Sequence, residues 1–276
     1  MINLLYAGND KVFDGLLISL LSVVKHTKEE IKAFVFTMDM TELDPKYKPL
    51  NEKHRLFIEK EIKKVNPLNE IVLVDCKKEF IATMNKKENI NTAYTPYTLL
   101  RLISDKIEGI PDKVLYLDTD TVSNNSVEEL YNIDVTDYEF AGVRDYYGKI
   151  FIGPNYINAG VLLFNIKKIR ETKLFEKSIH LLNTKKMSFP DQTALNKSVI
   201  KKLIIKPKYN SQRRWHESDV IQHFCKSIRW IPFFHTLNIK PWMVSDVHKK
   251  LKNYHYDELL YEYIALKKEF NENYQK

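Results

Sequence analysis

The chain has 276 residues, of which 44% are hydrophobic and 29% charged, so it can bury a substantial core as one domain or as one domain with an appendage. A balance of 43 basic against 36 acidic residues leaves a formal net charge of +7, a surplus that suits phosphorylated ligands, polyanions or anionic lipid surfaces. The 2 cysteines form no paired motif, which excludes a disulfide framework and the usual structural zinc sites. No targeting pattern opens the chain and its apolar segments are short, so we expect a cytoplasmic protein, with peripheral contact at the inner face of the membrane left open.

Strands and helices alternate along the first half of the chain. The strands read as short apolar runs bounded by turn residues, and the helices carry an apolar stripe or a charged surface pattern. The expected elements are strands over 2–7, 33–37, 70–74 and 113–117, a helix that begins at Asp14 or Gly15, and helices over 45–65 and 95–107. Such alternation predicts an α/β fold whose sheet is mainly parallel and is covered by helices on both faces.

The second half of the chain continues the pattern and ends in a helical extension. We expect strands over 139–143 and 160–164 and helices over 167–182, 191–199 and 257–276, which divides the chain into a domain at 1–242 and an extension at 243–276. The last helix has one apolar face, so we expect it to dock on its own domain; an interfacial helix on anionic lipid is the alternative. The stretch 197–214 contains seven basic residues and no acidic one, which makes it the best candidate surface for a membrane or an anionic acceptor.

Two aspartates, Asp118 and Asp120, directly follow the predicted strand over 113–117. In an extended chain residues i and i+2 point to the same face about 6.6 Å apart, so both carboxylates can converge on one cation. Oxygen ligands suit Mg²⁺ or Mn²⁺, which in turn bind phosphate oxygens, so the implied partner is a nucleotide or another phosphorylated small molecule. Aspartates that merely form a turn at the end of a strand are the alternative. No glycine-rich phosphate loop follows the first strand, so a metal and basic side chains would have to neutralise the phosphates of a bound nucleotide.

Five segments resemble, in their order and spacing, the family 8 glycosyltransferases, the group that includes glycogenin and bacterial galactosyl- and glucosyltransferases of surface polysaccharide. The segments are Ala7-Gly8-Asn9-Asp10, Arg101 together with the two aspartates, Asn158 to Asn165, Asp191-Gln192, and His235 to Trp242. The resemblance covers about residues 2–242. It implies a GT-A (Rossmann-like) nucleotide-sugar transferase fold with a helical C-terminal appendage, a UDP-sugar donor, Mn²⁺ with Mg²⁺ as an alternative, and transfer with retention of anomeric configuration.

The resemblance also implies roles for individual residues. Asp118, Asp120 and His235 would hold the metal, and the imidazole nitrogen favours Mn²⁺ over Mg²⁺. Asp191 would hold sugar hydroxyls and Gln192 would lie near the reacting carbon. Donor contacts are expected from Ala7, Asn9, Asp10, Arg101, Asp118, Thr119, Asn158 and Lys240, with Lys240 on the diphosphate, and an acceptor contact is expected from Asp145.

The expected activity is retaining transfer of glucose or galactose from a UDP-sugar to a hydroxyl of a saccharide or glycolipid acceptor, in the synthesis of cell-surface polysaccharide or lipopolysaccharide. One alternative is a haloacid dehalogenase-type phosphatase, in which Asp118 attacks phosphorus and Asp120 acts as acid and base. A whole β-α-β unit precedes the motif, however, and Asp191-Gln192 would have no role in such an enzyme. Another alternative is a basic nucleic-acid-binding protein, but the chain lacks an RNP-like aromatic motif or a zinc module, so no nucleic-acid partner is expected.

Overall fold

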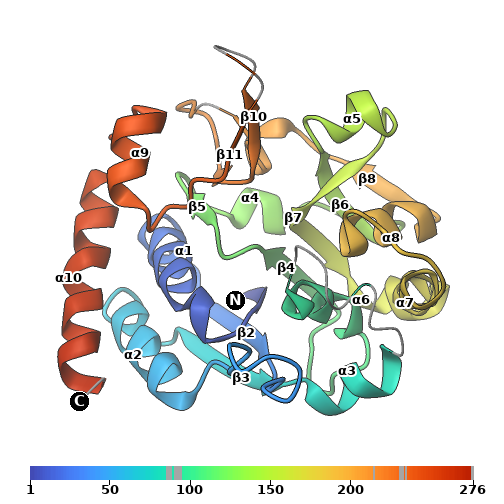
Figure 1. Ribbon diagram of the computed structural model, residues 1–276, viewed down its shortest axis with the longest axis horizontal. Helices are drawn as coiled ribbons and strands as arrows, with labels where there is room; N and C mark the ends of the chain where they lie inside the picture. Colours follow the sequence, from blue (N-terminus) through green and yellow to red (C-terminus); the bar gives the residue numbers. More distant parts are fainter. Residues whose placement is uncertain (85–88, 90–94, 214, 230–232, 234, 275–276) are drawn as a thin grey trace.

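A seven-stranded sheet forms the centre of the protein, with strand order β3-β2-β1-β4-β7-β6-β8 (Figure 1). The computed structural model describes residues 1–84, 89, 95–213, 215–229, 233 and 235–274. The strands are β1 (Ile2–Ala7), β2 (Ile31–Thr37), β3 (Glu70–Asp75), β4 (Lys113–Leu117), β6 (Phe140–Arg144), β7 (Ile157–Asn165) and β8 (Lys202–Ile204). β3, β2, β1 and β4 run parallel to one another, and β7 runs antiparallel to both β4 and β6. The expected mainly parallel sheet is therefore confirmed.

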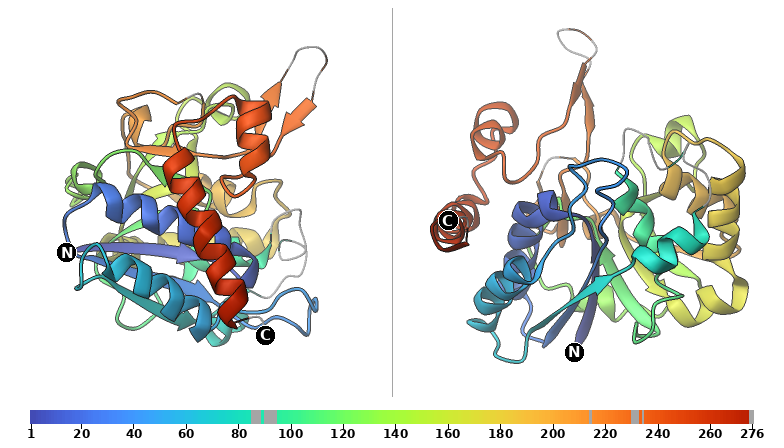
Figure 2. Two further views of the ribbon diagram at one scale, coloured as in Figure 1. Left: turned by 90° about the vertical axis from the view of Figure 1, so that its left-hand side faces the viewer. Right: turned by 60° about the horizontal axis from the view of Figure 1, so that its bottom comes forward.

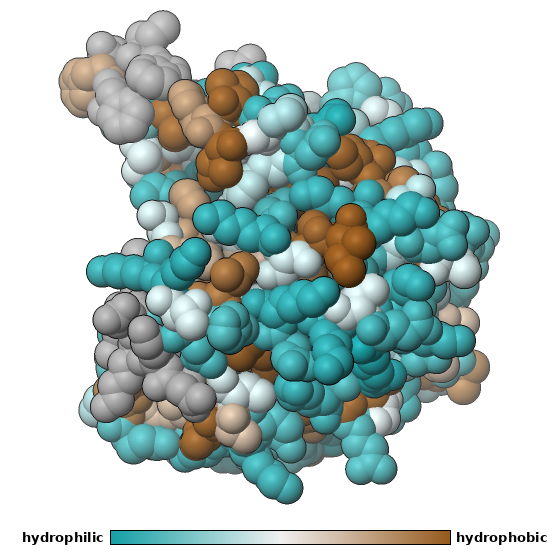
Figure 3. All heavy atoms as spheres, turned by 90° about the vertical axis from the view of Figure 1, so that its right-hand side faces the viewer, coloured by the Kyte–Doolittle hydropathy of each residue, from teal (hydrophilic) through white to brown (hydrophobic). Residues whose placement is uncertain are grey.

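Helices cover both faces of this sheet because its central strands are apolar on both sides. Along β1, Leu4 and Tyr6 belong to one buried cluster with α1 (Phe13–His26) and α2 (Glu52–Lys63). Leu5 points the opposite way, into a second cluster under the helices of the other face. Those helices are α3 (Lys77–Thr83), the 3₁₀ helix η2 (Pro96–Ile103), α6 (Ile166–Thr172), α7 (Leu174–Thr184) and α8 (Pro190–Ser198). The side of the molecule on which α7 and α8 lie is mostly hydrophilic, with small separate hydrophobic patches (Figure 3).

Local signals set helix ends that the apolar pattern had placed differently. The helix expected over 45–65 begins at Glu52, because the Asn51 side chain accepts hydrogen bonds from the backbone N–H groups of Lys53 and His54 and so caps α2. The single helix expected over 167–182 is divided into α6 and α7 by Lys173, whose φ of 57° lies in the left-handed region. A residue in that conformation cannot continue a right-handed helix.

The last helix of the chain docks on the N-terminal helices. α9 (Val244–Leu251) leads into α10 (Asp257–Tyr274), which lies alongside α1 and α2 (Figures 1 and 2). Its Phe270 ring packs 4.4 Å from the Phe13 ring and 5.1 Å from the Phe57 ring. Lys267 of the same helix forms an ion pair with Asp14 at 2.6 Å. The expectation that this helix packs on its own domain is confirmed, and no helix in the described part of the chain is long and apolar enough to cross a membrane.

Two small sheets and several short helices complete the described part of the fold. β5 (Thr121–Ser123) pairs antiparallel with β9 (Ile221–His223), and β10 (Ser227–Arg229) pairs antiparallel with β11 (His235–Leu237). The short helices of the described residues are η1 (Asp10–Val12), α4 (Glu128–Tyr131), α5 (Gly148–Phe151) and η3 (Pro207–Tyr209). β5 begins one residue after Asp120, so its pairing brings β9 to the two aspartates.

Candidate active site

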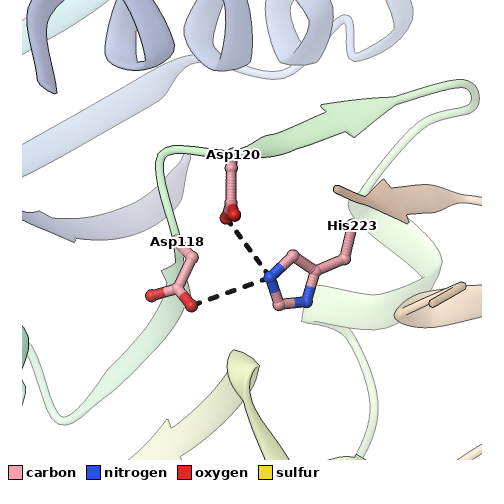
Figure 4. Close-up of side chains that lie close together, drawn as sticks. All are labelled: Asp118, Asp120 and His223. Carbon is pink, nitrogen blue, oxygen red and sulfur yellow. Dashed lines mark ion pairs between the residues drawn. The ribbon is translucent and has the colours of Figure 1, made fainter. Parts of the chain in front are cut away.

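Asp118, Asp120 and His223 form a cluster at the carboxyl end of β4 (Figure 4). One potential ligand atom from each residue lies within 4.8 Å of the other two. The Nε2 atom of His223 lies 3.2 Å from Asp120 Oδ1 and 3.8 Å from Asp118 Oδ2. Two carboxylate oxygens and one imidazole nitrogen are a suitable donor set for a divalent metal ion. The two aspartates therefore converge on one position, as their spacing predicted.

The histidine of this cluster differs from the one that the sequence analysis expected. His235 begins β11, a strand of the separate β10–β11 sheet, and its Nδ1 lies 2.8 Å from the Phe233 carbonyl oxygen. His223 instead ends β9 and pairs with Thr121, the residue after Asp120. The structure thus brings His223 to the two aspartates, and His235 as the third ligand of a metal stays a prediction. The available signal was the short run 220–224, in which Gln222 and His223 stand between apolar residues.

Gly160 allows the cluster to be compact. A Cβ atom at this position of β7 would lie 2.1 Å from Cε1 of His223 and 2.9 Å from Oδ2 of Asp118. The Gly160 carbonyl also accepts a 2.8 Å hydrogen bond from the Asp118 backbone N–H. Since a side chain would overlap both ligands, only glycine lets β7 approach so closely.

Arg101 holds two carboxylates from inside the protein. It is 2% exposed, its Nη2 donates to Asp118 Oδ1 at 2.9 Å, and its Nε lies 3.3 Å from Asp191 Oδ2. The Tyr116 hydroxyl donates to the same Asp118 oxygen at 2.7 Å, and the guanidinium stacks 4.0 Å above the Tyr116 ring. These contacts turn Oδ1 of Asp118 into the protein and leave Oδ2 facing His223. Burial raises the pKa of Asp191, although the Arg101 guanidinium opposes that change.

Asp120 lies between two basic side chains. His223 is on one side, and Lys240 on the other forms an ion pair with Asp120 Oδ2 and donates to the Phe224 carbonyl at 3.0 Å. Burial opposes ionisation of Asp120, but His223 and Lys240 outweigh it and hold the pKa of this carboxyl well below its usual range. Asp120 is therefore a carboxylate at neutral pH, the form that binds a cation.

A second group of polar residues meets next to the cluster. Gln192 accepts a 2.9 Å hydrogen bond from the Ala159 N–H, and its Nε2 lies 3.3 Å from Asp145 Oδ2. Asn158 donates to that Asp145 oxygen at 2.9 Å. The structure thus brings together Asn158, Asp145 and Gln192, which are remote in sequence.

The residues expected at the end of the first strand lie at the same edge of the sheet. β1 pairs in parallel with β4, with Leu5 opposite Tyr116, so the carboxyl ends of the two strands meet at Ala7 and Asp118. Asn9 is buried and donates to the Lys46 carbonyl at 3.3 Å, whereas Oδ1 of Asp10 is buried without a hydrogen-bond partner among the described residues. The position of Thr119 is set by close packing, because a Cβ on Gly15 of α1 would lie 2.5 Å from the Thr119 carbonyl oxygen.

Comparison with known proteins identifies the family. Residues 3–245 match the family model described as glycosyl transferase family 8. The chain belongs to glycosyltransferase family 8. A candidate glycosyltransferase of Haemophilus influenzae is 27% identical over 206 residues, which cover 70% of this chain and 58% of that protein. Lipopolysaccharide glucosyltransferase WaaO of Escherichia coli K12 is 32% identical over 128 residues, which cover 40% of this chain and 38% of that protein. The chain spans 58% or less of the length of the curated relatives that it matches.

Solved structures show the same architecture. Galactosyltransferase LgtC, solved in complex with donor and acceptor sugar analogues, superposes with a TM-score of 0.70 at 20% identity and covers 96% of each chain. Glycosyltransferase GlyE of Streptococcus pneumoniae superposes with a TM-score of 0.62 at 18% identity, covering 96% of this chain and 64% of GlyE. The fold of this family 8 member is therefore GT-A. The phosphatase and nucleic-acid-binding alternatives lose their support.

Proposed function

We propose that the enzyme transfers a hexose, glucose or galactose, from a UDP-sugar to a hydroxyl of a saccharide or glycolipid acceptor with retention of anomeric configuration, in the synthesis of cell-surface polysaccharide or lipopolysaccharide. Family membership and the named activities of two relatives support this proposal: WaaO is a lipopolysaccharide glucosyltransferase, and a relative from Salmonella typhimurium is a lipopolysaccharide 1,3-galactosyltransferase. The observation that carries it is the Asp118-Asp120-His223 cluster with Lys240 beside it. An acidic cation site next to a lysine suits a nucleoside diphosphate better than a neutral ligand.

Mn²⁺ is the metal that we propose for Asp118 and Asp120. An imidazole would be the third protein ligand, either that of His235, as the resemblance to the family implies, or that of His223, which lies beside the two aspartates in this structure. A mixed set of two oxygens and one nitrogen suits Mn²⁺ better than Mg²⁺, which prefers oxygen ligands and several waters. When bound, such an ion supplies positive charge to the diphosphate leaving group. In this structure the Lys240 ammonium forms an ion pair with Asp120. In the donor complex it would pair with a phosphate oxygen and so add to the stabilisation of the diphosphate leaving group.

Gln192 is the residue that we propose to face the reacting carbon of the sugar. A retaining glycosidase would use a carboxylate nucleophile, but an amide is a poor nucleophile. Transfer would therefore occur on the face of the leaving group, whose phosphate helps to deprotonate the acceptor hydroxyl while the Gln192 amide oxygen stabilises positive charge. One LgtC structure is of a mutant with an active-site glutamine replaced by glutamate, which supports a role for glutamine in that protein. Asp191 would hold sugar hydroxyls, and Asp145 would contact the acceptor.

Donor contacts from Ala7, Asn9, Asp10 and Thr119 are part of the proposal, since these residues lie beside the metal cluster at the carboxyl ends of β1 and β4. A peripheral membrane contact through residues 197–214 also stays a prediction. Within that stretch Lys208 pairs with Glu129 at 2.7 Å, and Arg214 lies outside the described residues.

Release of UDP from UDP-glucose and UDP-galactose in the presence of Mn²⁺ tests the proposal. Asp120→Asn removes one negative ligand without changing the size of the side chain, so we expect UDP release to fall on the order of 100-fold or more. Asp137→Asn is the matched control, because the Asp137 side chain is 78% exposed and forms a 3.7 Å surface ion pair with Lys201. Wild-type rates in Asp120→Asn, or no UDP release from either donor by the wild-type enzyme, would contradict the proposal.

A further inference from the structure

The end of α5 carries three consecutive apolar side chains that are open to solvent. Ile150, Phe151 and Ile152 are 63%, 68% and 54% exposed. Single exposed apolar residues are common on protein surfaces, but a contiguous group of bulky ones marks a contact with a partner or a membrane. We call these three residues the α5 tip. They follow β6 and Asp145, so they lie close in sequence to the residue proposed to contact the acceptor.

Each backbone N–H group of the α5 tip already has a hydrogen-bond partner within the protein. The first two donate to the Tyr147 carbonyl, both at 3.0 Å, and the third donates to the Gly148 carbonyl at 2.8 Å. Oδ1 of Asp145 fixes the start of this turn by accepting from the N–H groups of Tyr147 at 3.1 Å and Gly148 at 2.6 Å. Because an unpaired N–H is costly in lipid, this pairing removes the main obstacle to placing the α5 tip in apolar surroundings.

Exposed basic side chains lie beside the α5 tip. The guanidinium of Arg213 is 4.2 Å from the centre of the Tyr146 ring, and the ammonium of Lys149 is 5.1 Å from the same point. Asp145 is the one acidic residue of the segment 144–156, and the hydrogen bonds described above hold its carboxylate against the protein. The surroundings of the α5 tip are therefore positively charged.

The β10–β11 sheet extends this basic surface. The Tyr147 hydroxyl accepts from the Ile228 N–H at 3.2 Å and donates to the Ile228 carbonyl at 3.0 Å, which ties β10 to the turn before α5. Lys226 and Arg229, on either side of Ile228, are both exposed. The sequence has no acidic residue over 220–241. α5 and β10 lie at the same end of the molecule (Figures 1 and 2), so apolar and basic side chains share one surface.

We propose that the α5 tip inserts into a bilayer that contains anionic phospholipids, with Lys149 and Arg213 on the lipid phosphates. Apolar side chains beside basic ones are the combination that such a bilayer binds. A second copy of this chain fits less well, because two basic surfaces repel each other. The contact differs from the one predicted for residues 197–214, which rests on charge alone. One consequence rests on the proposed function: Asp145 would be held at the membrane surface, where a glycolipid acceptor would be found.

Flotation with lipid vesicles, in the absence of donor and acceptor, tests the contact. The wild-type protein is expected to float with vesicles that contain phosphatidylglycerol. The double variant Ile150→Ser, Phe151→Ser alters only exposed side chains, and we expect its affinity for these vesicles to fall on the order of 10-fold or more. The double variant Val65→Ser, Leu68→Ser is the matched control and should keep the wild-type affinity. Val65 and Leu68 are 52% and 65% exposed and precede the amino end of β3, at the opposite edge of the sheet.

The basic side chains are tested by a second pair of double variants. Lys149→Gln with Arg213→Gln is expected to weaken binding to phosphatidylglycerol vesicles about 10-fold and to leave binding to pure phosphatidylcholine unchanged. Lys197→Gln with Lys201→Gln removes the same charge from exposed positions of the stretch 197–214 and is expected to bind as the wild type does. A loss confined to this second variant would place the contact on that stretch and overturn the role of the α5 tip.

Phe151→Trp measures insertion itself. After subtraction of the wild-type signal, its fluorescence should shift to shorter wavelength with phosphatidylglycerol vesicles and be quenched by phospholipids brominated on their acyl chains, whereas Leu68→Trp should show neither effect. The inference is overturned if the wild-type protein does not float, or if substitution of the α5 tip abolishes self-association in sedimentation velocity but not flotation. No UDP-sugar is used, so these results decide the lipid contact whether or not the proposed transfer is correct.

Discussion

A single added atom at Gly160 would disturb the cluster of Asp118, Asp120 and His223. A Cβ here would lie 2.1 Å from the His223 ring and 2.9 Å from the Asp118 carboxylate, so Gly160→Ala must displace one of the two ligands. We expect Mn²⁺ affinity and UDP release to fall on the order of 10-fold or more. Overpacking would also lower the free energy of unfolding by about 1–3 kcal/mol. Mn²⁺ titration and urea denaturation measure the two effects separately.

Gly153→Ala is the control for this substitution, because a Cβ at Gly153 would meet no atom of the described part of the chain within 4 Å. This variant is expected to keep both the Mn²⁺ affinity and the stability of the wild type. If Gly160→Ala binds Mn²⁺ as well as Gly153→Ala does, the ligands have more freedom than the packing around β7 indicates.

Single residues differed in how far the sequence could predict their roles. Asp118 and Asp120 were predictable because two strand-end carboxylates of this spacing converge through local geometry alone. The contribution of His223 depends instead on the pairing of β5 with β9, a long-range contact that no local pattern encodes. Arg101 was expected at the donor, but its helix is buried, so its guanidinium holds Asp118 and Asp191 from within the protein. A direct donor contact by Arg101 stays a prediction.

The bounds of strands were most predictable where both faces of the strand are buried, because such a strand is a continuous apolar run. The predicted bounds of β1 and β4 agree with the structure, since their apolar runs end at turn residues. Errors occurred where one side chain or one dihedral angle decides the result, as at the Asn51 cap and at Lys173. The segment expected as a helix over 95–107 is the 3₁₀ helix η2, Pro96–Ile103. Apolar spacing alone does not distinguish that tighter turn from an α-helix.

The docking of α10 on α1 and α2 makes a prediction at the scale of an element. Phe270 is 3% exposed and packs against Phe13 and Phe57, so Phe270→Ala would lower the free energy of unfolding by about 3 kcal/mol. Ile264→Ala, on the same helix but 45% exposed, would change it by about 0.5 kcal/mol or less. Urea denaturation followed by circular dichroism measures both changes. An unaltered stability in Phe270→Ala, together with weaker binding to anionic vesicles, would instead favour a helix that lies on lipid.

The whole fold serves to bring distant segments to one edge of the sheet. The carboxyl ends of β1 and β4 meet there, as in other open α/β sheets whose ligands bind beyond the carboxyl ends of parallel strands. β7 runs antiparallel to β4 and presents Asn158 and Gly160 at this edge from the other side. Lys240 reaches Asp120 across a separation of 120 positions in the sequence. The cluster can therefore exist only when the entire domain is folded, and ligand binding is linked to the stability of the whole molecule.

Because ligand binding is linked to stability, the rise in Tm on ligand binding can show whether His223 or His235 binds the metal. A ligand that binds only the folded state at 100 times its Kd stabilises a protein by about 2.7 kcal/mol, so Mn²⁺ with UDP should raise the Tm of the wild-type protein. His223→Gln is expected to lose most of this rise, because it removes the imidazole that lies 3.2 Å from Asp120. His235→Gln is expected to keep it, since His235 lies on the separate β10–β11 sheet. The opposite result, a rise lost in His235→Gln and kept in His223→Gln, would mean that β11 rearranges on binding and that His235 supplies the third ligand.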